Sequence, residues 1–287
     1  MLPSIALVHD WLDAPGGGEA VLASLLRLFP GAPVFTLVDF LSADERARIG
    51  TTRIHTSALQ RAPWDVAASR NVDHFVANSR HIADTIARCY DRDATVIYPP
   101  VDIERFRNVA TAARSGYVTV SRLVPYKRID VLIDAFARMP DRQLTIVGDG
   151  PERQRLARNA SANVRFAGRL GDTATAEVLG RARAFVTAAY EDFGIAAVEA
   201  QASGTPVIAF RDGGASETIR DVDAAQPTGV LFDAQTPASI IAAVTRFEAM
   251  SIDADACRRN AMRFSEERFR AEFAAHFDAL TRSRRTR

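Results

Sequence analysis

The stretch from Glu191 to Glu199, EDFGIAAVE, holds residue types whose spacing suits a ligand that carries phosphate. Gly194 lets a ligand approach the backbone closely, and the residues from Ile195 onward are good helix formers. The N–H groups at the start of such a helix favour a phosphate. Glu199 would lie about 7 Å further along the axis, the reach from a diphosphate to its ribose. Glu191 would face a sugar beyond the phosphates. A helix with one capping acid and one exposed acid is the alternative.

A second charged turn, SRLVPYKR, covers residues 121–128. Arg122 and Lys127 flank its proline, so both cationic heads can converge on one anion. A guanidinium fork and a compact ammonium group together suit a diphosphate leaving group. Two solvated surface cations are the alternative.

Two glycine turns follow further apolar runs. Gly148-Asp149-Gly150 is a lone GxG, too short for the GxGxxG of a dinucleotide dehydrogenase. Gly213-Gly214 would let a ligand approach the backbone, while Glu217 would begin a helix. Since the carboxyl ends of parallel strands meet at one edge of a sheet, all four turns are expected at that edge. Their agreement indicates an anionic ligand that bears a sugar.

Short apolar runs that alternate with amphipathic stretches must position these turns. Strands are predicted at Ile5–His9, Val34–Val38, Arg53–Thr56, Val72–Ala77, Thr95–Tyr98, Tyr117–Ser121, Leu144–Val147, Asn163–Ala167, Ala184–Thr187, Val207–Phe210 and Gly229–Phe232. Helices are predicted at Glu19–Leu28, from Ser79 as N-cap to Tyr90, at Ile129–Arg138, after Pro151 in a first turn, at Ile195–Gln201 and from Thr236-Pro237 to Met250. The alternation predicts an α/β fold with parallel, doubly wound sheets.

The interval from Arg105 to Ser115 lacks periodicity and is predicted to be a linker. It separates an amino-terminal domain, 1–108, from a second domain, 109–287, which is expected to end in a C-terminal helix. The 287 residues and 31.3 kDa suffice for two domains. The tail Thr281–Arg287 holds four arginines and is expected to be a frayed, solvated end, with weak contact to anionic lipid as the alternative.

Composition narrows the class of protein. Hydrophobic residues make up 47% and charged residues 25%, and the net charge of +1 argues against a strongly basic nucleic-acid binder. No apolar run approaches the roughly 20 residues that span a bilayer, and the first residues read as a strand, not a signal peptide. Cys89 and Cys257 lie far apart, without metal-site spacing, so a reducing cytoplasmic setting is expected.

The motifs together resemble glycosyltransferase family 4, retaining nucleotide-sugar transferases of the GT-B fold, in which two Rossmann-like domains face a cleft. The second half carries the resemblance through SRLVPYKRID at 121–130, GDGP at 148–151, EDFGIAAVE at 191–199 and QASGTPVIAFRDGGASE at 201–217. The first half carries it through HDWLDAPGGGEAVL at 9–22, VDHFVANSRHIADTI at 72–86 and VIYPPVD at 96–102. Bacterial surface-polysaccharide mannosyltransferases that use GDP-mannose are the most similar branch.

The resemblance implies roles for these residues. Arg122 and Lys127 would hold the donor diphosphate, Glu199 the ribose, and Glu191 the transferred sugar. The substrate-binding positions that complete the site would be Gly16, Gly17, Gly18, Gly148, Asp149, Phe193, Gly194, Ile195, Gly214 and Glu217. No metal or other cofactor is implied. The partners would be a nucleotide sugar and a glycan or lipid-linked acceptor, handled in the cytoplasm or at the inner face of the membrane.

The first half departs from the family. Members usually carry a further block of strands and helices, with a histidine near the reacting sugar, where Pro63-Trp64 here runs directly into Asp65. We therefore expect an abbreviated first domain with an internal deletion. His9, predicted after the first strand and beside the glycine loop, is the best-placed replacement. His55 and His74 are expected to be structural. His81 and His276 are expected at the surface.

Two further hypotheses compete with a transferase. A protein that binds nucleotide sugars without turnover would keep the second half and lose acceptor binding. An epimerase or a glycan phosphorylase would share the fold, but no motif for a pyridoxal phosphate lysine is present and the 121–130 and 191–199 motifs favour transferases.

Overall fold

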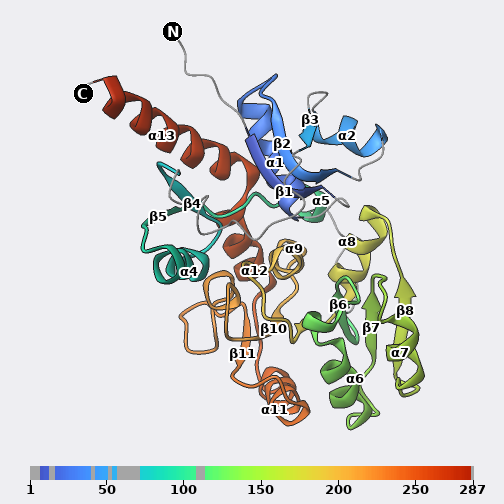
Figure 1. Cartoon of the computed structure of the whole chain (residues 1–287). Helices are drawn as coiled ribbons and strands as arrows, with labels where there is room; N and C mark the ends of the chain where they lie inside the picture. Colours follow the sequence, from blue (N-terminus) through green and yellow to red (C-terminus); the bar gives the residue numbers. More distant parts are fainter. Residues whose placement is uncertain are drawn as a thin grey trace. The chain divides into compact units, whose positions relative to one another are not determined.

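The computed structural model describes residues 7–12, 17–39, 43–50, 54–56, 72–107 and 114–285, and the chain divides into two units (Figure 1). The first unit comprises residues 1–78, 82–101 and 264–287. The second comprises residues 79–81 and 102–263. None of the described helices is both long and apolar enough to cross a membrane.

The second unit is built on a six-stranded parallel sheet. Its strands, in sequence order, are β6 (Tyr117–Val120), β7 (Leu144–Val147), β8 (Val164–Gly168), β9 (Ala184–Thr187), β10 (Val207–Phe210) and β11 (Gly229–Phe232). Their spatial order is β11-β10-β9-β6-β7-β8, which is the doubly wound order of a Rossmann-like fold. The strand order reverses between β6 and β9, so this pair marks the switch point where ligands bind in such sheets. The predicted α/β class is confirmed.

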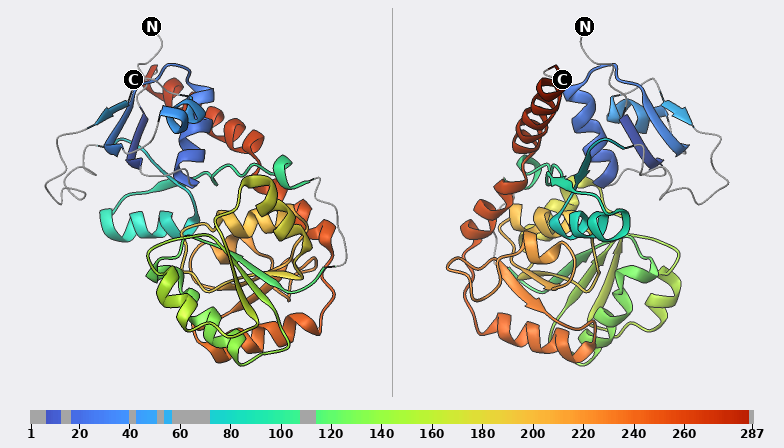
Figure 2. Two further views of the ribbon diagram at one scale, coloured as in Figure 1. Left: turned by 90° about the vertical axis from the view of Figure 1, so that its right-hand side faces the viewer. Right: turned by 60° about the vertical axis from the view of Figure 1, so that its left-hand side comes forward.

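Helices cover both faces of this sheet (Figures 1 and 2). On one face α6 (Ile129–Ala137) packs against α7 (Arg153–Arg158) and α11 (Pro237–Glu248). On the other, α9 (Ile195–Ala202) packs against α8 (Asp172–Arg181), α10 (Ala215–Thr218) and α12 (Ala254–Ala261). The short helix α5 (Glu104–Arg107) contacts α8 and α9, and the 3-10 turns are η1 (Pro125–Lys127) and η2 (Met262–Phe264). Because both faces are covered, β10 and β11 are buried along their whole length and most residues of β6, β7 and β9 are buried, whereas the edge strand β8 carries an exposed Arg165.

The described strands of the first unit form two separate parallel sheets. One contains β1 (Leu7–Leu12), β2 (Val34–Asp39) and β3 (Ile54–Thr56), and the other contains β4 (Phe75–Ala77) and β5 (Ala94–Val96). The helices are α1 (Gly17–Leu28), α2 (Ala43–Ile49), α4 (Arg80–Tyr90, after its first two residues) and α13 (Glu266–Arg285). The core of the first sheet buries Leu22, Leu26, Val34 and Ile49.

The C-terminal helix α13 belongs to the first unit, so the predicted domain 109–287 is corrected. The Phe277 ring lies 5.1 Å from the Phe29 ring that follows α1, and Arg27 pairs with Glu266 at 2.9 Å. The second unit begins at Asp102, so the predicted linker starts inside it, with helix α5. The tail expected to be frayed is helical as far as Arg285.

Several predicted boundaries differ. Strand β4 begins at Phe75, so His74 precedes the strand and is exposed, which corrects its expected place inside a strand. Strand β1 extends to Leu12, so His9 lies within the strand, paired in register with Thr36, and not after it. Helix α7 begins at Arg153, so Pro151 precedes the helix instead of occupying its first turn. The predicted cap at Thr236 is confirmed, since its side chain accepts a hydrogen bond from the Ser239 N–H.

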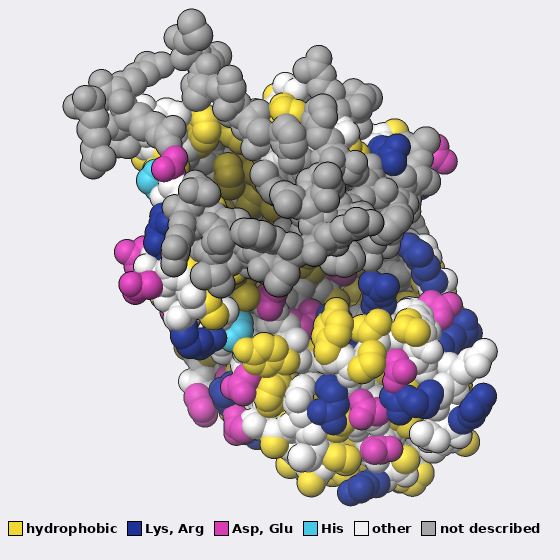
Figure 3. Space-filling model, in the orientation of Figure 1, with side chains coloured by type: hydrophobic (Ala, Val, Ile, Leu, Met, Phe, Trp, Pro, Cys, Tyr) yellow, Lys and Arg dark blue, Asp and Glu magenta, His cyan; other side chains and the backbone are white. Residues whose placement is uncertain are grey.

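Charges on the described surface are mixed. On the face in Figure 3, Lys and Arg side chains are interspersed with Asp and Glu over the second unit. This distribution agrees with the net charge of +1 and gives this face no broad basic patch.

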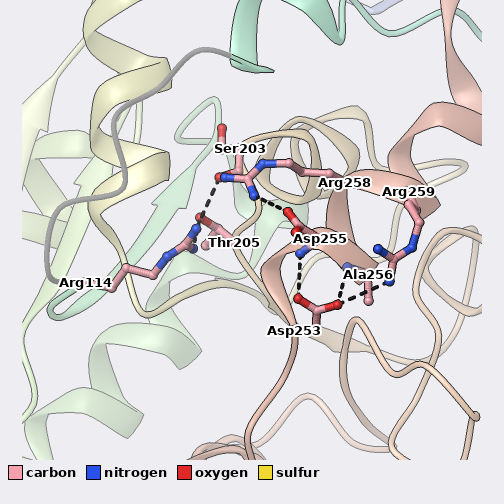
Figure 4. Close-up of polar contacts among 8 residues, drawn as sticks. All are labelled: Arg114, Ser203, Thr205, Asp253, Asp255, Ala256, Arg258 and Arg259. Carbon is pink, nitrogen blue, oxygen red and sulfur yellow. Dashed lines mark hydrogen bonds and ion pairs between the residues drawn. The ribbon is translucent and has the colours of Figure 1, made fainter.

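The turn between α9 and β10 is fastened at the amino end of the sheet (Figure 4). Arg114 donates to the Thr205 hydroxyl at 2.7 Å and to the Ser203 carbonyl at 3.3 Å. Arg258 approaches from the other side, pairs with Asp255 at 2.7 Å, and packs on Gly204, whose φ is +74°. These contacts fix the end of α9 that is remote from the switch point.

Candidate active site

The turns after β6 and β7 pack against each other through direct contacts between their backbones. The Leu123 N–H donates to the Asp149 carbonyl at 2.9 Å. A Cβ at Gly148 would lie 1.9 Å from the Ser121 carbonyl oxygen, and one at Gly150 would lie 2.4 Å from the Leu123 carbonyl oxygen. These glycines therefore admit the chain's own neighbouring turn.

The turns after β9 and β10 lock in the same way. The Gly214 N–H donates to the Glu191 carbonyl at 2.8 Å. A Cβ at Gly213 would lie 2.4 Å from the Glu191 carbonyl oxygen, and one at Gly214 would lie 2.4 Å from the Asp192 carbonyl oxygen. Gly213 and Gly214, expected to admit a ligand, thus first admit the backbone of the 191–193 turn.

Lys127 and Glu191 form an ion pair across the switch point. The Lys127 Nζ lies 3.0 Å from the Glu191 Oε1, and the two side chains are 16% and 26% exposed. Lys127 ends η1 in the turn after β6, and Glu191 lies in the turn after β9. The Tyr126 ring lies beneath the Lys127 ammonium, with its centroid 5.0 Å from Nζ. Sequence analysis selected both charged residues but not their direct contact.

Arg122 lies exposed in the same turn, two residues after β6 ends. Its convergence with Lys127 on one anion stays a prediction.

Helix α9 begins at Ile195, as predicted, with Gly194 as its N-cap. Gly194 has φ +88°, the left-handed conformation that glycine adopts without strain. No side chain caps this end. The Ala197 N–H donates to the Gly194 carbonyl at 3.0 Å, so the N–H groups of Ile195 and Ala196 are the first-turn donors available to an anion among the described contacts. The neighbouring Phe193 side chain is buried in the core, so only its backbone is placed to meet a ligand.

Glu199 is largely buried one turn into α9, with a side chain that is 17% exposed. The Arg105 Nη2 donates to its Oε1 at 2.8 Å. Burial raises the pKa of the Glu199 carboxyl to about 7, while Arg105 opposes that rise and Asp172 and Asp102 add to it. The alternative of an exposed acid is therefore wrong.

Arg105 is the residue that sequence analysis missed. It lies in the interval without periodicity, and its partners Asp172 and Glu199 lie on α8 and α9, far along the chain. The only signal was its charge within an otherwise featureless linker.

Glu217 is engaged by the chain itself. Its two carboxylate oxygens accept from the backbone N–H groups of Arg80 at 2.9 Å and His81 at 3.0 Å. The His81 Nε2 lies 2.7 Å from the Tyr190 hydroxyl, so His81, expected at the surface, is partly exposed and hydrogen-bonded. The Glu217 carboxylate, predicted to bind substrate, accepts hydrogen bonds from two backbone amides in this structure.

The Asp149 side chain contacts residues of its own turn and of the helix that follows. Its Oδ1 accepts from the Gly150 N–H at 2.8 Å and its Oδ2 pairs with Arg153 at 3.2 Å, while half of the side chain stays exposed. The exposed part leaves Asp149 accessible to a ligand at the mouth of the turn.

Several predicted positions fall in the first unit. Gly17 and Gly18 open helix α1, and Gly16 lies outside the described residues. The side chain of His9 and the junction at 63–65 also lie outside them.

Comparison with known proteins identifies the family of this chain. Residues 102–264 match the family described as glycosyl transferases group 1. A D-inositol 3-phosphate glycosyltransferase of Streptomyces coelicolor is 30% identical over 329 positions, which take in 96% of this chain and 67% of that protein. A GDP-mannose-dependent monoacylated alpha-(1-6)-phosphatidylinositol monomannoside mannosyltransferase of Corynebacterium glutamicum is 39% identical over 147 residues, 42% of this chain and 39% of that protein.

Other relatives extend well beyond the matched part. A D-inositol 3-phosphate glycosyltransferase of Streptomyces bingchenggensis is 30% identical over 62% of this chain but only 45% of its own length. The chain thus spans about half the length of several curated relatives that it matches.

Solved structures share the fold. HepE of Anabaena, in complex with UDP and glucose, superposes with a TM-score of 0.76 at 17% identity, over 96% of this chain and all of that chain. The apo lipopolysaccharide outer core galactosyltransferase WaaB superposes with a TM-score of 0.77 at 16% identity, over the same shares. With its GT-B fold and a family match over more than half of its length, the chain belongs to the glycosyl transferases group 1 family.

Proposed function

We propose that this protein is a retaining hexosyltransferase that uses a nucleotide diphosphate sugar as donor and a glycan or lipid-linked glycan as acceptor, in surface polysaccharide biosynthesis. The observation that carries the proposal is the Lys127–Glu191 ion pair at the switch point, where the turns after β6 and β9 meet. A cation for a leaving diphosphate and a carboxylate for sugar hydroxyls lie there within 3.0 Å of each other.

The donor would lie along α9 in a fixed direction. The diphosphate would meet Arg122, Lys127 and the N–H groups at Gly194 and Ile195. The ribose would reach the Glu199 carboxylate, one turn into the helix. The transferred hexose would extend the other way, toward Glu191. The proposed site would need no cofactor, because the cations and the helix N-terminus would together stabilise the diphosphate.

The reaction would exchange one bond at the anomeric carbon. The bond from that carbon to the diphosphate oxygen breaks, and a bond to the acceptor hydroxyl oxygen forms on the same face of the sugar. The proton of that hydroxyl leaves with the diphosphate. Lys127 and Arg122 stabilise the negative charge that grows on the leaving group, which is the point where preorganised charge accelerates transfer most.

Mannose from GDP-mannose is the favoured hexose. The GDP-mannose-dependent mannosyltransferase of Corynebacterium glutamicum, at 39% identity, supports this choice. UDP and UDP-glucose are the compounds bound in the Anabaena HepE structures, so uridine nucleotides are the competing donors. A cytoplasmic location and weak contact with the membrane face stay predictions.

A second candidate is a protein that binds nucleotide sugars without transferring them. The described strands of the first unit form two sheets rather than one, which supports a missing block of strands. The alignment with the Streptomyces coelicolor relative supports it too. It runs over 329 positions but takes in 96% of a 287-residue chain, so parts of that relative have no counterpart here.

One pair of measurements separates the two candidates. Calorimetric titration with GDP and UDP shows binding under both. Release of GDP from GDP-mannose, or of UDP from UDP-glucose, with a glycan acceptor or water occurs only if the protein turns over. Failure to bind either nucleotide contradicts both candidates.

A further inference from the structure

Arg105 lies against the carboxylate assigned above to ribose. Its Nη2 donates to the Glu199 Oε1 at 2.8 Å, and its Nη1 lies 3.1 Å from the Asp172 Oδ2. Its guanidinium carbon stands 4.5 Å from the centroid of the Phe106 ring, and its Nε is buried without a partner among the described residues. Two carboxylates and an aromatic face therefore hold the guanidinium in one orientation.

The charged groups that face Glu199 come from three places. Arg105 lies on α5, Asp172 lies on α8, and Asp102 precedes α5. Burial and both aspartates favour the protonated form of Glu199, and Arg105 is the cation among these groups that opposes them. Without Arg105, this carboxyl would be protonated at neutral pH.

Protonation would matter for a ribose. An ionised carboxylate is an acceptor only and can take hydrogen bonds from vicinal hydroxyls, whereas a protonated carboxyl presents a donor. Among the contacts of the described residues, Arg105 engages Oε1 and leaves Oε2 for such hydroxyls.

We propose that Arg105 is a positioning residue for the donor nucleotide, which favours the ionised form of Glu199 and fixes its Oε1 so that Oε2 accepts the ribose hydroxyls. This inference rests on the proposed function, because it takes Glu199 as the ribose carboxylate. A merely structural role, in which the pair ties α5 to α9, would change the stability of the fold but not the recognition of ribose.

The test measures the contribution of the ribose hydroxyls as a ratio of two dissociation constants. Calorimetry on the full chain measures Kd for GDP or UDP, whichever binds more tightly, and for its 2′,3′-dideoxy analogue. The ratio of the second Kd to the first reports the ribose hydroxyls. Titration of the phosphates cancels in this ratio because both compounds carry the same diphosphate.

The wild-type ratio is expected to rise about tenfold from pH 6 to pH 8, as a carboxyl with a pKa of about 7 ionises. Arg105→Met should move the midpoint of this rise upward by about 1–3 pH units, the usual effect of removing an opposite charge. Arg105→Lys should keep most of the wild-type profile, and Asp172→Asn should move the midpoint downward. The last two variants keep the test open if Arg105→Met does not fold.

Arg142→Met is the matched control. The Arg142–Glu248 pair has a similar length, 2.7 Å, and similar exposure, 34% and 20% against 30% and 17% for Arg105–Glu199. It lies before β7, at the amino end of the sheet, so its loss should leave the ratio unchanged at every pH.

The outcomes are distinct. A wild type that binds neither nucleotide overturns the proposed function and this inference together. A wild-type ratio that Glu199→Gln leaves intact overturns the ribose assignment. A ratio that depends on Glu199 but keeps its midpoint in Arg105→Met overturns the role of Arg105 alone. Where Arg105→Met does not fold, an unmoved midpoint in Asp172→Asn does so.

Discussion

At the scale of single residues, the charged side chains of the site form ion pairs with one another. Lys127 is the only lysine in the sequence, and it faces Glu191 at 3.0 Å. Glu199 in turn is held by Arg105 at 2.8 Å. Both pairs join residues that are distant in sequence, so sequence analysis could select the charges but not their partners.

Lys127→Ala should slow transfer by about 10²-fold, the usual loss when one preorganised stabilising group is removed. It should also weaken binding of the nucleoside diphosphate while leaving the uncharged nucleoside unaffected, because only the diphosphate meets the ammonium. Steady-state kinetics and calorimetry measure both effects. Unchanged kinetics would show that the 121–128 turn does not face the leaving group.

Glu199→Gln should stabilise the protein increasingly as the pH rises. The folded-state pKa of Glu199, about 7, lies above its ordinary value of 4.5. Protonated Glu199 therefore contributes fully to the stability of the wild type below about pH 4.5, and this contribution is lost as the pH rises through 7. Thermal unfolding of both proteins between pH 5 and pH 8.5 should show the melting temperature of the variant gaining on that of the wild type. A constant difference would mean that Glu199 does not titrate in this range.

At the scale of elements, two pairs of interlocked turns set the position of the chemistry. The 121–124 turn locks into 148–150, and the 191–193 turn locks into 213–214. The glycines are required because backbone meets backbone there. A Cβ at Gly148 would enter the Ser121 carbonyl, and its φ of +130° excludes an L side chain in any case.

Gly148→Ala should therefore destabilise the second unit by about 3 kcal/mol or more, from backbone strain and overpacking together. Gly171→Ala is the control, because Gly171 has φ −71° and no atom within 4 Å of its Cβ position. Because Gly171 is the N-cap of α8, where alanine is less favourable than glycine, the cost of this substitution should be about 1 kcal/mol or less. Chemical denaturation measures both, and equal losses would contradict the interlock.

Sequence analysis gave the six strands of the second unit to within one residue, because each is a short β-branched or aromatic run between turn residues. It missed α8, whose Thr-rich and Ala-rich sequence has few apolar residues to mark a period. It did not predict that Glu217 accepts hydrogen bonds from the chain's own amides, and a role for Glu217 in ligand binding stays a prediction. The amides that Glu217 binds lie more than 130 residues earlier, and only the folded chain brings them there.

At the scale of the whole molecule, the chain returns to its first unit after building the second. Helix α13 packs its aromatic side chains on Phe29, and the Phe277 and Phe29 rings lie 5.1 Å apart. The family match, by contrast, covers 102–264, which is almost the whole second unit. Donor binding and the stability of the first unit should therefore be separable.

Phe277→Ala should lower the unfolding temperature of the first unit, with a loss of about 1–3 kcal/mol for a half-buried aromatic side chain. Affinity for the nucleoside diphosphate should not change. Calorimetric unfolding and nucleotide titration on the same variant check both. A parallel fall in affinity would mean that the two units share the donor site.

The most direct test uses the single lysine. Amine-selective acetylation of the native protein, followed by mass spectrometry, reports Lys127 against the chain's amino terminus as internal reference. The account predicts that GDP or UDP slows acetylation at Lys127 while the matching nucleoside does not, and that the amino terminus reacts at one rate throughout. A rate at Lys127 that neither nucleoside diphosphate changes would contradict the placement of the donor diphosphate at the switch point.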